Sequence, residues 1–233
     1  MNSFDSSIIS FLNDFAGHWK TFDELMVFMS DSSLVKAGPI MACLIWLWFR
    51  RETDGPSRRD YIVATIITGI VAVVIARLLA SALPFRERPM ADAAQRFVVP
   101  SGAGRDLESW SSFPSDHAVL FFALATGLYQ AHKPFGIGAF AWAIVVVCFP
   151  RLYLGIHWPT DIIGGAALGV ALGWLGTSRA VRDAVCERLM PWHDAQPAVF
   201  YTGLFIVMFE VMNLFEDGRE ALHLLHHAAG NIL

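Results

Sequence analysis

Charged residues are scarce in this 233-residue chain. Asp, Glu, Lys and Arg make up 16% of it and hydrophobic residues 55%, whereas soluble domains contain about 25% charged and about 45–50% apolar residues. The composition therefore argues against both a soluble globular domain and a disordered chain. The formal net charge of −4 gives no excess of basic residues, so nucleic acid is not an expected partner.

Cysteine is also rare. Cys43, Cys148 and Cys186 lie far apart, and two of them fall inside apolar runs. Neither a disulfide framework nor a cysteine zinc site is expected, and nothing in the sequence calls for a metal or a cofactor. The first 30 residues carry acids early and have no uninterrupted apolar stretch, so they do not have the pattern of a short cleavable signal.

Long apolar runs dominate the rest of the chain. A helix needs about 20 apolar residues to cross a bilayer, and six runs approach that length: 34–49, 61–84, 117–131, 135–154, 160–176 and 198–215. They predict an all-α, polytopic six-helix bundle, with one membrane domain over 31–216 and a polar tail over 217–233. Within 160–176, Gly164, Gly165, Gly169 and Gly173 have the spacing of a helix that packs closely against another.

Residues 1–30 differ from these runs because apolar and acidic residues alternate at helical spacing. The pattern predicts an amphipathic segment at the membrane surface, and a helix packed against the bundle is an equally favoured alternative. Lys36, just beyond this segment, is expected to extend outward to the interface.

Positive charge indicates the topology. With six spans, the arginine-rich loops 50–60 and 177–193 and the short loop 132–134 share one side, which should be the cytoplasm. Loop 85–116 and turn 155–159 then face outward. Three polar clusters at the outer ends of the apolar runs would meet there: 84–89, 113–117 and 151–161.

These clusters contain the groups of a metal-free phosphoryl-transfer site. Arg88 and Arg151 can bind phosphate oxygens through their planar forks. Ser115 stands where a helix begins, so its hydroxyl and the free backbone N–H groups suit an anion. His157 and His117 offer a nucleophile and a general acid, and Asp161, four residues after His157, could hydrogen-bond its ring.

The three clusters resemble the motifs of the type-2 phosphatidic acid phosphatase family, which includes the undecaprenyl pyrophosphate phosphatases. Its pattern is Lys-x6-Arg-Pro, Pro-Ser-Gly-His and Ser-Arg-x5-His-x3-Asp. The resemblance covers roughly residues 60–176. It implies that His157 attacks phosphorus, that Asp161 orients His157, and that His117 protonates the leaving oxygen and then activates water. It also implies a set that holds the phosphoryl oxygens: Arg88, Arg151, Ser115 and the backbone amide of Asp116.

Three positions depart from the family pattern. Ser81 stands in place of the lysine, and Arg86 or Arg77 could replace the missing charge, with Arg86 favoured. Asp116 replaces a glycine, and its carboxylate would repel phosphate unless it points away. Pro150 replaces a serine, so one hydroxyl donor is lost.

The resemblance and the outward site favour a lipid pyrophosphate substrate, most of all undecaprenyl pyrophosphate. They imply a bacterial-type inner membrane with the active site on its outer face, and membrane lipids as partners. The alternatives are phosphatidic acid, phosphatidylglycerophosphate or a non-catalytic lipid-phosphate-binding protein, and the oligomeric state is left open. Near the C-terminus, Glu220, His223 and His227 share a helical face, for which a solvated amphipathic tail is favoured over zinc binding.

Overall fold

A computed structural model describes residues 2–50, 58–104 and 111–214, and helices are the only regular secondary structure among them. The long elements are α3 (Ser33–Phe49), α4 (Arg58–Ala82), α5 (Asp116–Ala131), α8 (Pro159–Gly176), α9 (Arg179–Ala195) and α10 (Pro197–Met212). Shorter ones are α1 (Ser3–Asn13), α2 (Lys20–Asp31), η1 (Ala93–Gln95), α6 (Lys133–Trp142), η2 (Ala143–Cys148) and α7 (Phe149–Tyr153). The predicted all-α fold is thus confirmed for the described residues.

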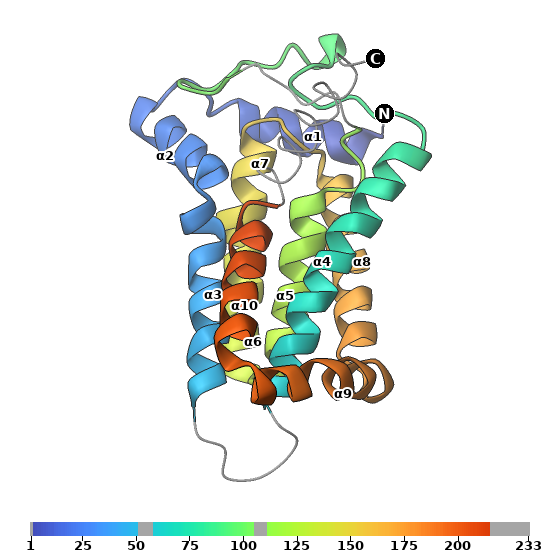
Figure 1. Cartoon of the computed structure of the whole chain (residues 1–233). Coiled ribbons are helices and arrows are strands. Elements are labelled where there is room, and N and C mark those ends of the chain that lie inside the picture. Colours follow the sequence, from blue (N-terminus) through green and yellow to red (C-terminus); the bar gives the residue numbers. More distant parts are fainter. Residues whose placement is uncertain (1, 51–57, 105–110, 215–233) are drawn as a thin grey trace, which may run out of the picture.

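Each of the predicted apolar runs contains one helix of an upright bundle (Figure 1). The run 135–154 is a continuous helix from Lys133 to Tyr153, whose middle part, η2, is a π-helix. Pro150 has no N–H to bond the carbonyl four residues before it, which favours this local widening. Helix α9 lies across one end of the bundle, and α1 lies across the other (Figure 1).

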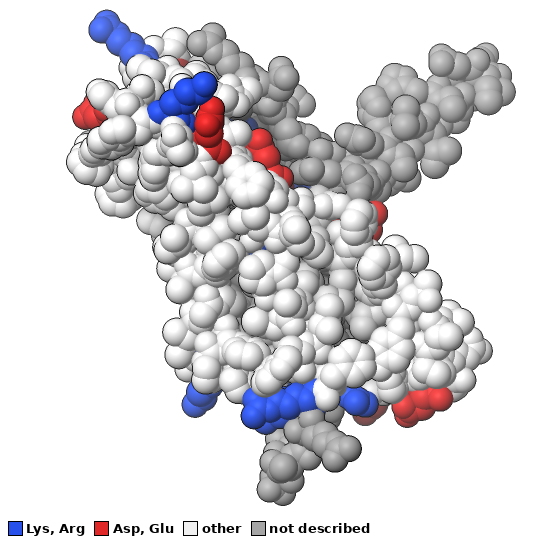
Figure 2. All heavy atoms as spheres, turned by 90° about the vertical axis from the view of Figure 1, so that its left-hand side faces the viewer, with Lys and Arg blue, Asp and Glu red and all other residues white. Residues whose placement is uncertain are grey.

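Only some helices of this bundle have, by themselves, the length and composition of a membrane span. Helix α4 and the helix from Lys133 to Tyr153 do so alone. The pairs α2–α3, bent by 55°, and α8–α9, bent by 64°, do so only when each pair is taken together. The described residues therefore hold two to four candidate spans, fewer than the six predicted. On the face in Figure 2, charged side chains gather at the two ends, and the belt between them is largely uncharged, as in an integral membrane protein.

Helix α5 forms the centre of the bundle, where it packs against α4, α6 and α8. Its contact with α8 is close because glycines line the α8 face. A Cβ atom at Gly169 would lie 2.4 Å from the carbonyl oxygen of Val119, and one at Gly165 would lie 2.7 Å from that of Ser115. The predicted glycine packing is confirmed. This packing also brings the N-terminal ends of α5 and α8 together.

The N-terminal residues form α1 and α2. Helix α1 buries Asp5 and Ile9 against the bundle. Large apolar side chains along and just after it are exposed: Phe4, Phe11, Phe15 and Trp19. The segment therefore packs on the bundle and also presents an apolar surface outward.

Candidate active site

Backbone hydrogen bonds join the three polar clusters at the end of the bundle covered by α1. The N–H of Ser112 donates to the carbonyl of Arg86 at 2.9 Å, and that of Met90 to the carbonyl of Gly155 at 3.0 Å. The N–H of Ser115 donates to the carbonyl of Asp161 at 3.3 Å. Segments that are far apart in the sequence thus form one site, as the sequence predicts.

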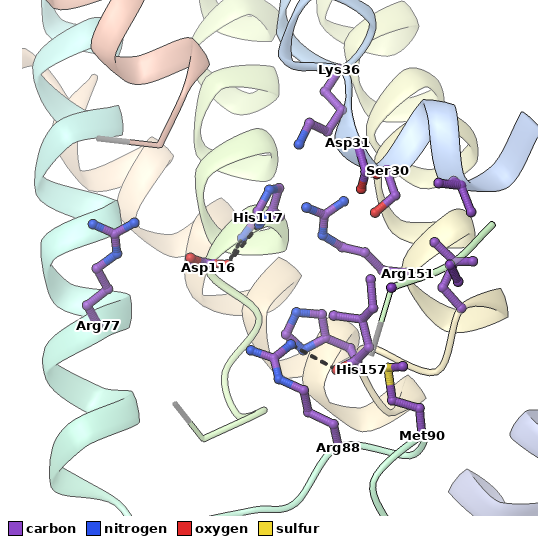
Figure 3. Close-up of a pocket in the computed structure, with 15 residues that line it drawn as sticks. Ser30, Asp31, Lys36, Arg77, Arg88, Met90, Asp116, His117, Arg151 and His157 are labelled. Carbon is purple, nitrogen blue, oxygen red and sulfur yellow. Dashed lines mark hydrogen bonds and ion pairs between the residues drawn. The ribbon is translucent and has the colours of Figure 1, made fainter. Parts of the chain in front are cut away.

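A cavity of about 430 Å³ opens between these segments and the α2–α3 junction (Figure 3). Its polar side chains come from five helices and two loops: Ser30, Asp31, Lys36, Arg77, Arg88, Asp116, His117, Arg151 and His157. Four of these residues are cationic and two are acidic, so the cavity has an excess of positive charge that suits an anionic ligand.

His157 is buried in the turn that precedes α8, with 4% of its surface exposed. Its Nδ1 lies 2.9 Å from the carbonyl oxygen of Ser112. A carbonyl can only accept, so Nδ1 carries the proton and Nε2 carries a lone pair. Burial lowers the pKa of His157 below its ordinary value, and the charge of Arg88 lowers it further, against the opposing effect of Asp161. At neutral pH the ring is therefore neutral, as a nucleophile requires.

Asp161 does not make the predicted hydrogen bond with His157. Its Oδ2 lies 3.8 Å from Nδ1 of His157 and instead accepts the backbone N–H of Trp158 at 2.8 Å. Its Oδ1 accepts from Nη1 of Arg86 at 2.5 Å. The reason is local, because Asp161 lies in the first turn of α8, where a carboxylate caps the free N–H groups. The carbonyl of Ser112 takes the expected place of Asp161.

His117 has a carboxylate partner of its own. Oδ1 of Asp116 lies 2.9 Å from Nδ1 of His117 and also accepts the backbone N–H of His117 at 2.7 Å. Asp116 is among the residues that line the cavity, so its negative charge lies at the candidate phosphate site (Figure 3). Asp116 fixes the Nδ1 proton of His117 and with it the orientation of the ring.

The Arg151 guanidinium lies near the centre of the cavity (Figure 3). Arg151 is 5% exposed, and within the described residues its buried Nε and Nη1 have no hydrogen-bond partner. Buried donors that face a cavity suit a multiply charged anion. Nη1 of Arg88 donates to the carbonyl of Ile156 at 3.1 Å, which ties this arginine to the turn that carries His157.

Ser115 is the N-cap of α5, where its Oγ accepts the N–H of Ala118 at 3.4 Å. It is fully buried and is not among the residues that line the cavity. Its hydroxyl oxygen therefore caps the helix that carries His117, and the contact of Ser115 with phosphate stays a prediction.

Arg86 does not replace the missing lysine of the first motif. Its guanidinium points to the N-terminal end of α8 and pairs with Asp161 at 2.5 Å and Asp5 at 2.6 Å. Arg77 and Lys36 line the cavity instead.

Lys36 does not extend outward to the interface as predicted, because only 5% of its surface is exposed. A lysine inside an apolar run was the signal that could have identified it.

No group of three or more His, Cys, Asp or Glu that could hold a metal ion occurs in the described part of the chain. Glu220, His223 and His227 lie outside the described residues.

Two histidines and two arginines thus line one cavity at the end of the bundle, and this set of groups suits phosphoryl transfer. The profile of the PAP2 superfamily matches residues 57–183, which is more than half of the chain. The chain belongs to this superfamily.

Named relatives agree with this assignment. YbjG of Escherichia coli strain K12 is 24% identical over 196 residues, which are 83% of this chain and 92% of that protein. The undecaprenyl-diphosphatase BcrC of Bacillus subtilis strain 168 is 25% identical over 72% of this chain and 80% of that protein. The crystal structure of a PAP2-type phosphatidylglycerolphosphate phosphatase from Bacillus subtilis shares the fold, with a TM-score of 0.51 and 23% identity over 74% of this chain and 82% of that one. Together with the family, they identify an integral membrane lipid phosphatase.

Proposed function

We propose that the protein hydrolyses the diphosphate of a polyprenyl carrier lipid, undecaprenyl diphosphate, through a phosphohistidine at His157. The observation that carries the proposal is the hydrogen bond from His157 Nδ1 to the carbonyl of Ser112, because it leaves a lone pair on Nε2. A neutral, oriented imidazole beside two arginines is a nucleophile for an anionic phosphorus centre.

The first step breaks the bond between the terminal phosphorus and the bridging oxygen. Nε2 of His157 attacks the terminal phosphorus, and His117 gives its Nε2 proton to the bridging oxygen, which leaves as lipid monophosphate. Asp116, at 2.9 Å from Nδ1 of His117, stabilises the imidazolium before this transfer. Arg88 and Arg151 bind the oxygens of the transferred phosphoryl group, whose charge is spread over them in the transition state.

The second step returns the enzyme to its starting state. His117, now neutral, takes a proton from water, and the oxygen of that water attacks the phosphorus of the phosphohistidine. The phosphorus–nitrogen bond breaks, inorganic phosphate leaves, and His157 regains its lone pair on Nε2. In this scheme Asp161 is a positioning residue and not a reacting group. It caps α8 and binds Arg86.

The choice of a diphosphate lipid is supported by two observations. The relative BcrC is named an undecaprenyl-diphosphatase, and the cavity has more cationic than acidic side chains. A lipid diphosphate carries more negative charge than a phosphate monoester, so a strongly cationic site favours it.

The proposal includes a membrane arrangement. Residues 31–216 form one membrane domain whose six apolar helices all cross the bilayer, and the arginine-rich end that includes α9 faces the cytoplasm. The active site then faces outward from a bacterial-type inner membrane. The exposed Phe4, Phe11 and Trp19 near α1 contact the lipid interface, as in an amphipathic anchor.

Phosphate release by the detergent-purified protein tests the proposal. Undecaprenyl diphosphate, phosphatidic acid and phosphatidylglycerophosphate are compared at equal surface concentration in mixed micelles, with His157→Ala as the control. We expect the diphosphate to have the highest kcat/KM and His157→Ala to be inactive but folded. Rapid quenching with a terminally labelled diphosphate should trap an acid-labile, base-stable phosphoprotein. Preference for a glycerolipid would reject the substrate, and turnover by His157→Ala would reject the nucleophile.

A further inference from the structure

Lys36 is a buried cation that the three family motifs do not include. It lies near the start of α3, is 5% exposed and lines the cavity. The indole Nε1 of Trp142 donates to its carbonyl oxygen at 3.1 Å, which fixes this turn of α3 against α6. Removing a lysine from water in a membrane bundle is costly, so such a residue marks a functional site by default.

The position of Lys36 relative to the two histidines is informative. Figure 3 shows His157 on one side of the cavity and Lys36 on the other, and the His117 ring lies between them. In phosphoryl transfer, the attacking and leaving atoms are roughly in line with phosphorus. A phosphorus attacked by His157 therefore has its leaving group on the His117 side, which is also the side of Lys36.

We propose that Lys36 binds the second phosphate of a diphosphate substrate, the one that stays attached to the lipid. The inference rests on the proposed function and deepens it, since it names the group that distinguishes a diphosphate from a monoester. When the bond to the bridging oxygen breaks, negative charge develops on this second phosphate. An ammonium group near it stabilises the leaving lipid monophosphate.

Three other cations line the cavity, and the proposed mechanism already places Arg151 with the transferred phosphoryl group. Nη2 of Arg77 donates to the carbonyl of Leu214 at 2.6 Å, so this guanidinium is engaged with the chain just after α10. Arg88 is tied to the turn of His157 through the carbonyl of Ile156, which places it with the transferred phosphoryl group. Lys36 comes from the opposite wall, on α3.

A substitution that removes this charge tests the proposal. Lys36→Met keeps the length of the side chain, Lys36→Gln keeps a polar group, and Lys36→Arg keeps the charge. Lys20→Met is the matched control, because the Lys20 side chain is 78% exposed on α2. The readout is the ratio of kcat/KM for farnesyl diphosphate to that for farnesyl phosphate, with thermal stability in detergent measured for each variant.

We expect the ratio to fall by about 10- to 100-fold in Lys36→Met and Lys36→Gln, the equivalent of one charge-assisted hydrogen bond. Lys36→Arg should recover most of the ratio, and Lys20→Met should leave it unchanged. Inhibition gives a second readout that needs no turnover of the probe. Methylenediphosphonate should inhibit the wild type more strongly than inorganic phosphate does, and Lys36→Gln should lose that difference.

An unchanged ratio in both uncharged variants, or an equal loss on both substrates, would overturn the role of Lys36. The proposed function fails in a different way, if the wild type hydrolyses monoesters and releases no phosphate from diphosphates. The two failures are therefore separable in the same set of assays.

Discussion

Asp5 on α1 offers the sharpest test of how the end of the bundle holds the nucleophile. Its carboxylate is fully buried and accepts the backbone N–H of Thr160 at 2.9 Å and its hydroxyl at 2.6 Å. It also pairs with Nη2 of Arg86 at 2.6 Å, and the same guanidinium binds Asp161. Asp5→Ala removes three acceptor contacts at once and leaves Arg86 with a single carboxylate.

The expected loss of stability follows from these contacts. Breaking a buried ion pair by removing one partner costs about 3–5 kcal/mol. The Arg86 side chain is 28% exposed and keeps Asp161, so part of that cost is recovered by solvent, and about 2–3 kcal/mol is expected for Asp5→Ala. For a chain of this size, each kcal/mol lowers Tm by about 2–4 °C, so the shift should be about 4–12 °C.

Activity should fall as well, because Arg86 and Thr160 flank the start of α8 and the turn that carries His157. A displacement of about 1 Å in a catalytic group can cost about 100-fold in rate, so we expect kcat to fall by about 10- to 100-fold while KM changes little. Thermal unfolding in detergent and steady-state phosphate release measure the two effects. Asp14→Ala is the control, since Asp14 is exposed at the end of the same helix.

Unchanged Tm and unchanged kcat in Asp5→Ala would refute the reasoning. A double-mutant cycle with Arg86→Ala adds a stricter criterion, because residues that share a network should be coupled by about 0.5–3 kcal/mol. Additive effects would mean that α1 is not linked to α8 through Arg86.

Three further predictions concern the catalytic pair and the packing. Burial lowers the pKa of His157, so its neutral, nucleophilic form should persist below the ordinary histidine pKa of about 6.5. The acid limb of the pH profile of kcat/KM, corrected for substrate ionisation, should therefore have its midpoint below that pH. A midpoint above it would contradict the assignment of His157 as the nucleophile. Asp116→Gly, which introduces the family residue, should lower kcat by about 10- to 100-fold through loss of imidazolium stabilisation, and an unchanged kcat would mean that Asp116 does not assist His117. Gly169→Ala should lower Tm, since the added Cβ would lie 2.4 Å from a backbone oxygen. Gly138→Ala should not, because no heavy atom lies within 4 Å of a Cβ at that position. Equal changes of Tm in the two variants would argue against close α5–α8 packing.

Much of the architecture could be predicted from the sequence because it depends on local pattern. Apolar runs mark helices, and the glycines of α8 mark its contact with α5. The convergence of the motifs at one end follows from the alternation of spans. These features rest on periodicity and side-chain size, which a sequence displays directly.

The finer geometry of the site could not be predicted because it depends on contacts between distant segments. Asp161 has the spacing of a histidine partner, yet its carboxylate accepts the backbone N–H of Trp158 at the start of α8. Arg86 is near Arg88 in sequence but turns toward Asp5 of α1. Lys36 comes from a run that shares no motif with the other residues of the cavity.

The carbonyl that accepts the Nδ1 proton of His157 belongs to the main chain at Ser112. Replacing the side chain at that position does not remove the carbonyl group, so a scan of single side-chain substitutions does not test the acceptor itself. The tautomer of His157 therefore depends on the backbone conformation around Ser112. Different sequences can preserve this tautomer as long as they keep that conformation. Chemical replacement of the amide at this position by an ester would be a more direct probe of its acceptor than any genetic change.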